Sequence, residues 1–313
     1  MKQKMMNGQP VIVVGVDHGY SNMKTAHACF PSGVKAWDTE PVFKNDMLAF
    51  EGRYYTIGAG HKEYTPNKDR DDDYYILTLA AISEELDLQG ITECSVFLAA
   101  GLPLTWVSKQ RDTFKAYLLR NKHVDYVFRG KDYHLDIVGA EIYPQGFSAI
   151  ANELHKFEGA NMLCDIGNGT MNILVIKDRK PVPEKCSTEK FGTYQCTLAA
   201  RKSLMEKLTK DVDEFVIESV LRNGTADISE QVLEVIRDTA KEYVEGIMRR
   251  LREYGYDPEL MRLYVIGGGG CLVKNFCEYD QRRVTINEDI CATAKGYESL
   301  ANYTLSGKGE RIV

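Results

Sequence analysis

The sequence predicts an α/β protein built from two similar halves. Short apolar runs typical of buried strands alternate along the chain with segments of helical periodicity. A strand, an Asp-x-Gly turn and a second strand occur in that order twice, at Val11–Ala28 and at Leu163–Ile176. Internal repetition is stronger evidence than a single motif, so the pair predicts two related halves that face a shared ligand. The length of 313 residues agrees with about two domains.

The second copy of the motif reads LCDIGNGTMNILVI. Two apolar runs around a Gly-Asn-Gly-Thr turn predict a hairpin. Gly167 and Gly169 remove side chains that would keep a ligand from the backbone amides, and such a turn is a nest for an anion, phosphate above all. A phosphate beside Asp165 requires a cation between them, so a divalent ion is expected. The motif alone leaves open a tight hairpin with a structural aspartate.

The first copy reads VIVVGVDHGYSNMKTAHA. It adds Lys24, a point charge that can reach a phosphate oxygen. When Asp17 is aligned with Asp165, the following positions correspond: Gly19 with Gly167, Ser21 with Gly169, Asn22 with Thr170, and Met23 with Met171.

Composition is that of an ordinary globular protein, with 44% hydrophobic residues and a net charge of -6. The acidic balance argues against a chain that coats DNA. No apolar run approaches the ~20 residues of a membrane span, and the first residues lack a secretory h-region. Eight cysteines without a CxxC pair indicate a reducing cytoplasm and no zinc site. The histidines are isolated, which favours packing or surface roles.

The remaining segments divide into short strands and helices. Residues 30–75 are interpreted as a small insertion, in which the polar stretch His61–Asp73 is a solvated loop tip. It is not an EF-hand loop, because Tyr74 occupies the glycine position. A threonine cap at Thr193 is expected. Helices are expected at 74–86, 109–121, 147–157, 193–209, 229–254 and 287–300, and strands at 54–57, 93–101, 126–129, 132–137, 140–146 and 262–266.

Three further signals follow strands or lie on the last helix. Gln145, between Pro144 and Gly146, is either a turn residue or an amide that orients a water. Gly267–Gly270 permits close backbone packing against a flat or charged group, although its spacing is not the Rossmann GxGxxG. Gly296, with neighbouring alanines, permits close helix packing.

Five signals therefore stand in a fixed order: Asp17-x-Gly19, Pro144-Gln145-Gly146, Asp165-x-Gly167-x-Gly169-Thr170, Gly267–Gly270, and Ala294-x-Gly296. This order resembles the nucleotide-contacting segments of the actin, sugar kinase and heat-shock chaperone superfamily. Within it, the chain resembles the ParM/StbA-type actin-like proteins that segregate plasmids, from about Val11 to Leu300.

The resemblance implies an actin-like α/β fold with two similar lobes around a central nucleotide cleft. Each lobe would be a mixed sheet flanked by helices. Domain I is expected at 1–160, with the insertion at about 30–75 and a returning C-terminal helix at about 290–313. Domain II is expected at 161–290, with a helical subdomain at about 201–260.

The resemblance also implies ATP or GTP with Mg²⁺ and gives residues their roles. Asp17 and Asp165 would hold the metal mostly through water, and Gln145 would position the attacking water, with Asp165 as the second catalytic residue. Asn172 stands where many relatives carry an aspartate, which brings the hydrolysis rate into question. The implied nucleotide contacts are Gly19, Tyr20, Ser21, Asn22, Lys24, Gly167, Asn168, Gly169 and Thr170 at the phosphates, Lys241 and Glu242 at the ribose, and Gly267, Gly268 and Gly269 at the adenosine, with Gly296 at a hinge.

The implied function is a cytoplasmic ATPase that forms head-to-tail filaments and segregates plasmid DNA through a ParR-type DNA-binding adaptor. The chain itself would contact neither nucleic acid nor membrane. One alternative is a small-molecule kinase, although no aspartate base over a substrate pocket is evident. Another is a scaffold related to MreB or FtsA, against which the polar tail SGKGERIV argues because it has no apolar helical face.

Overall fold

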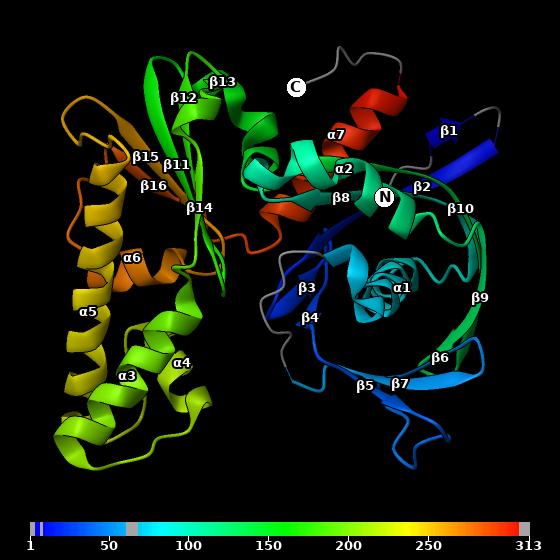
Figure 1. Ribbon diagram of the computed structural model, residues 1–313, viewed down its shortest axis with the longest axis horizontal. Coiled ribbons are helices and arrows are strands. Elements are labelled where there is room, and N and C mark those ends of the chain that lie inside the picture. Colours follow the sequence, from blue (N-terminus) through cyan, green and yellow to red (C-terminus); the bar gives the residue numbers. More distant parts are fainter. Residues whose placement is uncertain (1–3, 7–8, 61–67, 307–313) are drawn as a thin grey trace. The chain divides into compact units, whose positions relative to one another are not determined.

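The computed structural model describes residues 4–6, 9–60 and 68–306 (Figure 1). The chain divides into two compact units, unit 1 with Met1–Asn152 and Cys291–Val313, and unit 2 with Glu153–Ile290. Each has its own sheet and its own core. The expectations placed on residues 61–67 and on the tail from residue 307 fall outside the described residues.

The sheet of unit 1 runs in the order β4-β3-β2-β8-β10-β9-β6-β7-β5, with β1 paired to β2. β8 is parallel to both β2 and β10, and the other neighbours are antiparallel. The β6–β9 pairing joins the segment expected to be an insertion to this sheet. The strands are β1 (Lys4–Met6), β2 (Gln9–His18), β3 (Asn22–Lys24), β4 (Cys29–Pro31), β5 (Val34–Trp37), β6 (Met47–Phe50), β7 (Arg53–Ile57), β8 (Glu93–Leu102), β9 (His123–Phe128) and β10 (Lys131–Pro144).

Helices cover both faces of β2 because its apolar side chains alternate between them. Ile12 and Val14 belong to the core that contains α1 (Asp72–Asp87), whereas Val11 and Val13 pack with α7 (Ala292–Leu305). Figure 1 shows α1 within the curve of the sheet. The other helices here are η1 (Lys68–Arg70), α2 (Leu104–Leu118) and η2 (Phe147–Lys156), which crosses into unit 2.

The sheet of unit 2 runs in the order β13-β12-β11-β15-β16, with β14 paired to β12. β15 is parallel to β11 and β16, and the remaining pairs are antiparallel. Its strands are β11 (Ala160–Ile166), β12 (Met171–Lys177), β13 (Lys180–Pro181), β14 (Ser187–Glu189), β15 (Arg262–Ile266) and β16 (Val284–Ile286). Its helices are η3 (Pro183–Lys185), α3 (Thr193–Leu208), α4 (Glu214–Asn223), α5 (Glu230–Glu253) and α6 (Gly270–Phe276).

Several boundaries differ from the predictions. The two strands expected at 132–146 are one strand, β10, because a bulge between Ile137 and Gly139 interrupts its alternation without ending it. α4 was not predicted, although Ile217, Val220 and Leu221 form its buried face. α7 begins at residue 292 rather than 287, and α2 begins at 104 rather than 109.

The polar stretch that was predicted to be a solvated loop tip is partly buried, so that prediction was wrong for its described end. Lys68 is only 1% exposed, and the Asp71 side chain caps α1 by accepting from the Asp73 amide at 3.1 Å. Within the described residues, no helix is both long and apolar enough to cross a membrane.

Candidate functional site

The two Asp-x-Gly hairpins have the same register. In β2 and β3, Asp17 lies opposite Lys24, and in β11 and β12, Asp165 lies opposite Asn172. The strand that carries the aspartate is in each case parallel to its next neighbour, β8 in unit 1 and β15 in unit 2. A parallel third strand follows in both, β10 and β16. The two copies of the sequence motif therefore also share the same pairing of their strands.

Both turns bring their first glycine toward the carbonyl three residues later. A Cβ at Gly19 would lie 2.3 Å from the Asn22 carbonyl oxygen, and one at Gly167 would lie 3.3 Å from that of Thr170. The first turn therefore excludes any side chain at this position. Ser32 also donates its hydroxyl to the Gly19 carbonyl at 2.8 Å.

Asp17 is 8% exposed and lies between an amide and a cation. The Gln145 side chain, at the end of β10, donates Nε2 to Asp17 Oδ1 at 3.1 Å. Lys24 Nζ lies 3.6 Å from Asp17 Oδ2. Unit 1 thus brings three of the predicted site residues together. With its amide nitrogen on the carboxylate, Gln145 keeps its side-chain carbonyl oxygen as a hydrogen-bond acceptor.

Lys68 is a buried cation beside this hairpin that the sequence analysis missed. Its ammonium donates to the His18 carbonyl and lies 5.1 Å from the centre of the Tyr20 ring. Burial lowers the pKa of Lys68 to about 8, and the nearby Asp17 carboxylate opposes that shift. The side chain therefore holds positive charge against the backbone of the first turn. No local sequence pattern marks Lys68 as a buried lysine.

His18 has a packing role, as expected of the isolated histidines. Its imidazole is fully buried, with Nε2 2.8 Å from the Thr78 hydroxyl and edge-on to the Phe114 ring. Burial and the charge of Lys68 lower the pKa of His18 to about 3, so the ring is neutral near pH 7.

In unit 2, two glycines pack close to the aspartate and to the strand that carries it. A Cβ at Gly267, whose φ is +83°, would lie 2.6 Å from Asp165 Oδ1, and one at Gly269 would lie 2.2 Å from Ile166 Cγ2. Both glycines are therefore explained by close packing against β11. Gly268 has open space where its Cβ would be, so it is the member of the run beside which a ligand has room.

The second turn is fixed by the start of α3. The amides of Thr193 and Tyr194 donate to the carbonyls of Gly167 and Asn168, each at 3.0 Å, and the Thr193 hydroxyl donates to Asn168 Oδ1 at 2.9 Å. The predicted threonine cap was wrong by one residue, because Gly192 is the N-cap. A side chain at Gly192 would collide with the Asn168 carbonyl, 2.2 Å away.

Four other predicted residues lie on elements outside the two turns. The buried Asn172 accepts from the Thr188 hydroxyl at 2.9 Å, which secures β14 to β12. Lys241 and Glu242 lie on the exposed side of α5, where Lys241 pairs with Asp238 at 3.8 Å. Their assignment to a ribose stays a prediction. Gly296 lets α7 pack directly on the Ser148 carbonyl.

Each unit offers a single carboxylate for a metal rather than a metal-holding cluster. Among the described residues, no three or more His, Cys, Asp or Glu side chains form a metal-holding group. Mg²⁺ is usually bound by one or two carboxylates together with waters and phosphates rather than by an all-protein cage. Asp17 and Asp165 each supply one carboxylate at a glycine-bearing turn. None of the eight cysteines, all within the described residues, forms a disulfide.

Two family models match the sequence. Residues 15–147 match the N-terminal domain of actin-like proteins, and residues 163–278 match the C-terminal domain of the archaeal actin homologue MreB-like. The turn after Asp17 lies in the first model and the turn after Asp165 in the second. No curated protein matches the sequence at a significant level.

Solved structures of actin homologues share the fold over nearly their whole length. The archaeal actin homologue Ta0583, in complex with ADP, is 21% identical, with a TM-score of 0.71 over 93% of this chain and 99% of that chain. A non-polymerisable quadruple mutant of pCBH ParM is 17% identical, with a TM-score of 0.72 over 93% and 99%. Bacillus thuringiensis ParM with ATP is 14% identical, with a TM-score of 0.69 over 94% and 98%.

Two mixed sheets flanked by helices, each with the same aspartate-bearing hairpin, define the actin-like fold. This confirms the predicted fold class. The two family models together span most of the sequence, and both describe domains of actin-like proteins.

Proposed function

We propose that this protein is a nucleotide-driven actin-like filament protein that hydrolyses ATP. The observation that carries the proposal is the pair of hairpins with one register and an aspartate at the same position in each. Relatives of the same fold have been solved with ADP and with ATP, which supports a nucleotide as the shared ligand.

In this proposal both hairpins bind the same nucleotide. The turns Gly19–Asn22 and Gly167–Thr170 hold the phosphates through backbone amides, and Lys24 adds a positive charge. Asp17 and Asp165 hold the magnesium that accompanies the nucleotide, which would neutralise developing phosphate charge. Gln145 is too weak a base to take a proton, so its role is to orient water for in-line attack.

The cellular role that we propose is plasmid segregation through filaments. Subunits join head to tail, and a heterologous contact that does not close on itself produces a filament. A separate ParR-type adaptor binds the DNA, since a chain of net charge -6 is poorly suited to bind phosphate backbones directly. The similarity to ParM structures supports this role.

A second candidate is a cytoskeletal scaffold related to MreB. The match of residues 163–278 to the archaeal MreB-like family favours it. The two candidates share nucleotide-dependent assembly and differ in the partner that the filament carries. Co-sedimentation with a DNA-bound adaptor distinguishes them.

Right-angle light scattering tests the proposed function. On addition of ATP and Mg²⁺, scattering is expected to rise above a critical protein concentration, and ATP with EDTA serves as the control. The same measurement with GTP in place of ATP shows which nucleotide base the protein prefers. A signal that stays flat at high protein concentration would reject the filament and favour a small-molecule kinase or a binding module.

A further inference from the structure

A short segment between β14 and α3 contacts the second turn on both of its sides. We call residues 189–192 the linking segment. At one end, Glu189 pairs with Met171, the residue that follows the turn. At the other end, the amides at the start of α3 donate to the carbonyls of Gly167 and Asn168. The position of the linking segment therefore helps to fix the position of the turn.

One side of α5 contacts the linking segment at three of its residues. The Tyr243 hydroxyl donates to the Gly192 carbonyl at 2.7 Å, and the Tyr243 ring stacks on Phe191, with 4.5 Å between the ring centres. The Arg250 guanidinium lies 4.6 Å from the centre of the Phe191 ring and donates Nη1 to Glu189 Oε2 at 3.1 Å. A spacing of seven residues places Tyr243 and Arg250 on the same side of the helix.

Gly192 is the residue through which Tyr243 reaches the turn. Gly192 is buried, and a Cβ there would lie 2.2 Å from the Asn168 carbonyl oxygen and 2.7 Å from that of Gly167. Its backbone is therefore packed directly against the turn. Burial raises the pKa of Tyr243, so the hydroxyl keeps its proton and stays a donor near pH 7.

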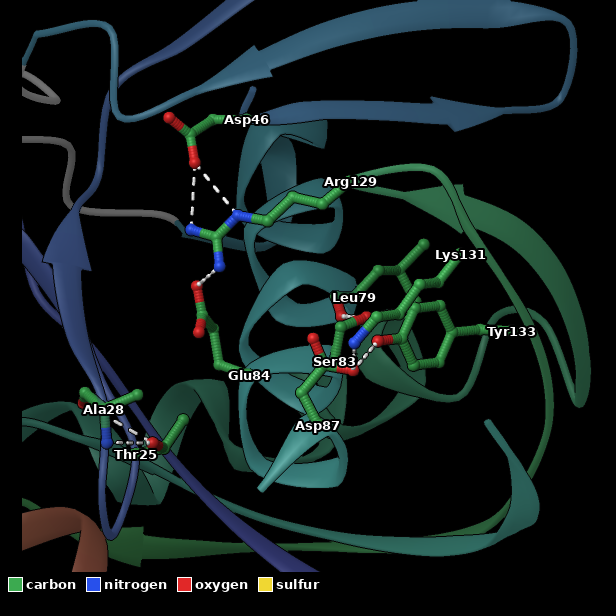
Figure 2. A network of polar contacts seen from close by, with 10 residues as sticks. All are labelled: Thr25, Ala28, Asp46, Leu79, Ser83, Glu84, Asp87, Arg129, Lys131 and Tyr133. Atoms are coloured by element: carbon green, nitrogen blue, oxygen red, sulfur yellow. Dashed lines mark hydrogen bonds and ion pairs between the residues drawn. The ribbon is translucent and has the colours of Figure 1, made fainter. Parts of the chain in front are cut away.

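Unit 1 shows a related arrangement after its own Asp-x-Gly turn. β3 leads into a tight turn in which the Thr25 amide donates to the Ala28 carbonyl and the Ala28 amide donates to the Thr25 hydroxyl, each at 2.9 Å (Figure 2). Glu85 on α1 accepts from the His27 amide in this turn at 2.7 Å. In each unit, a side chain on a helix thus binds the backbone of the chain that follows the Asp-x-Gly turn. Unit 1 uses a carboxylate and unit 2 uses a hydroxyl.

We propose that Tyr243 is a positioning residue for the second turn. By binding the Gly192 carbonyl it fixes the start of α3, whose amides in turn fix the carbonyls of Gly167 and Asn168. The turn is then held in one conformation before a phosphate arrives. Such preorganisation reduces the conformational freedom that is lost on binding. The inference rests on the proposed function, in which this turn holds the phosphates of a nucleotide.

Tyr243→Phe tests this role, because it removes the hydroxyl and keeps the ring that stacks on Phe191. ATP affinity in magnesium is expected to fall about fivefold, the effect of one lost hydrogen bond. Affinity for adenosine should stay the same, since adenosine has no phosphate. Isothermal titration gives the dissociation constant and the number of binding sites separately. The number of sites should equal that of the wild type.

A matched control and a second measurement locate the effect. Tyr256→Phe removes a hydroxyl from another tyrosine of the unit 2 core, 4% exposed, and should leave ATP affinity unchanged. Amide hydrogen exchange follows the contact itself. In free Tyr243→Phe, the amides of Thr193 and Tyr194 should exchange faster than in the wild type, because they donate to the turn.

Three results would overturn the positioning role and leave the proposed function in place. They are an unchanged ATP affinity in Tyr243→Phe, equal losses of affinity for ATP and adenosine, and fewer binding sites with an unchanged dissociation constant. The last result would show that the hydroxyl supports only the fold. A wild-type protein that binds no ATP would overturn both the proposed function and the role of Tyr243.

Discussion

The two hairpins share a register but differ in what surrounds their aspartates. In unit 1, Asp17 lies near Lys24 and Lys68 and accepts from Gln145. In unit 2, Asp165 lies against Gly267, and the turn after it is bound to the amides at the start of α3. Charged and amide side chains are prominent around Asp17, and the backbone packs closely beside Asp165. In the proposed function, unit 1 therefore supplies Gln145 and Lys24, and unit 2 supplies a phosphate loop held by the start of α3.

Removing either aspartate should have the largest effect. Asp17→Ala and Asp165→Ala are each expected to lower ATP affinity in magnesium on the order of 100-fold, or ~2.8 kcal/mol, because a metal ligand is lost. Asp165→Ala should also abolish nucleotide-dependent assembly. Isothermal titration with ATP, with and without EDTA, measures the loss. Equal losses in both conditions would contradict a role in holding the metal.

Gln145→Ala should separate hydrolysis from binding. Phosphate release is expected to slow by roughly 10–100-fold, because the attacking water is no longer oriented. Nucleotide affinity and filament assembly should persist, since the carboxylate of Asp17 stays in place. A phosphate-release assay during assembly follows both steps. If this variant hydrolysed ATP at the wild-type rate, Gln145 would have no role in positioning water.

Lys68→Met tests whether the buried charge serves the first turn. ATP affinity is expected to fall about tenfold, or ~1.4 kcal/mol, while affinity for adenosine stays the same. Lys35→Met is the surface control, because the exposed Lys35 lies over the Trp37 ring at 4.0 Å. Equal losses for ATP and adenosine would show that Lys68 acts only through the fold.

Substitutions in the glycine run after β15 should have the smallest effects. They separate a glycine needed for the fold from one beside which a ligand has room. Gly267→Ala is expected to destabilise the fold by about 1–3 kcal/mol, because of its positive φ and its contact with Asp165. Gly268→Ala should leave the denaturant midpoint unchanged and weaken nucleotide binding a few-fold. Unchanged binding in Gly268→Ala would remove that residue from the adenosine site.

Local sequence patterns predicted the hairpins. The features that the sequence analysis missed depend on contacts between residues far apart in the sequence. Apolar runs around Asp17 and Asp165 with short glycine turns specify strand pairs at short range, so fold class and hairpins were predictable. The Lys68 ammonium donates to the carbonyl of His18, 50 residues away in sequence, and no local pattern encodes such a contact. Because of the bulge before Gly139, the single strand β10 was predicted as two strands.

A crystal structure with a non-hydrolysable ATP analogue and Mg²⁺ tests the central claim most directly. The account predicts that the carboxylates of Asp17 and Asp165 both face the metal-bound phosphates of one nucleotide. A nucleotide held by one hairpin alone, or bound away from both aspartates, would contradict it.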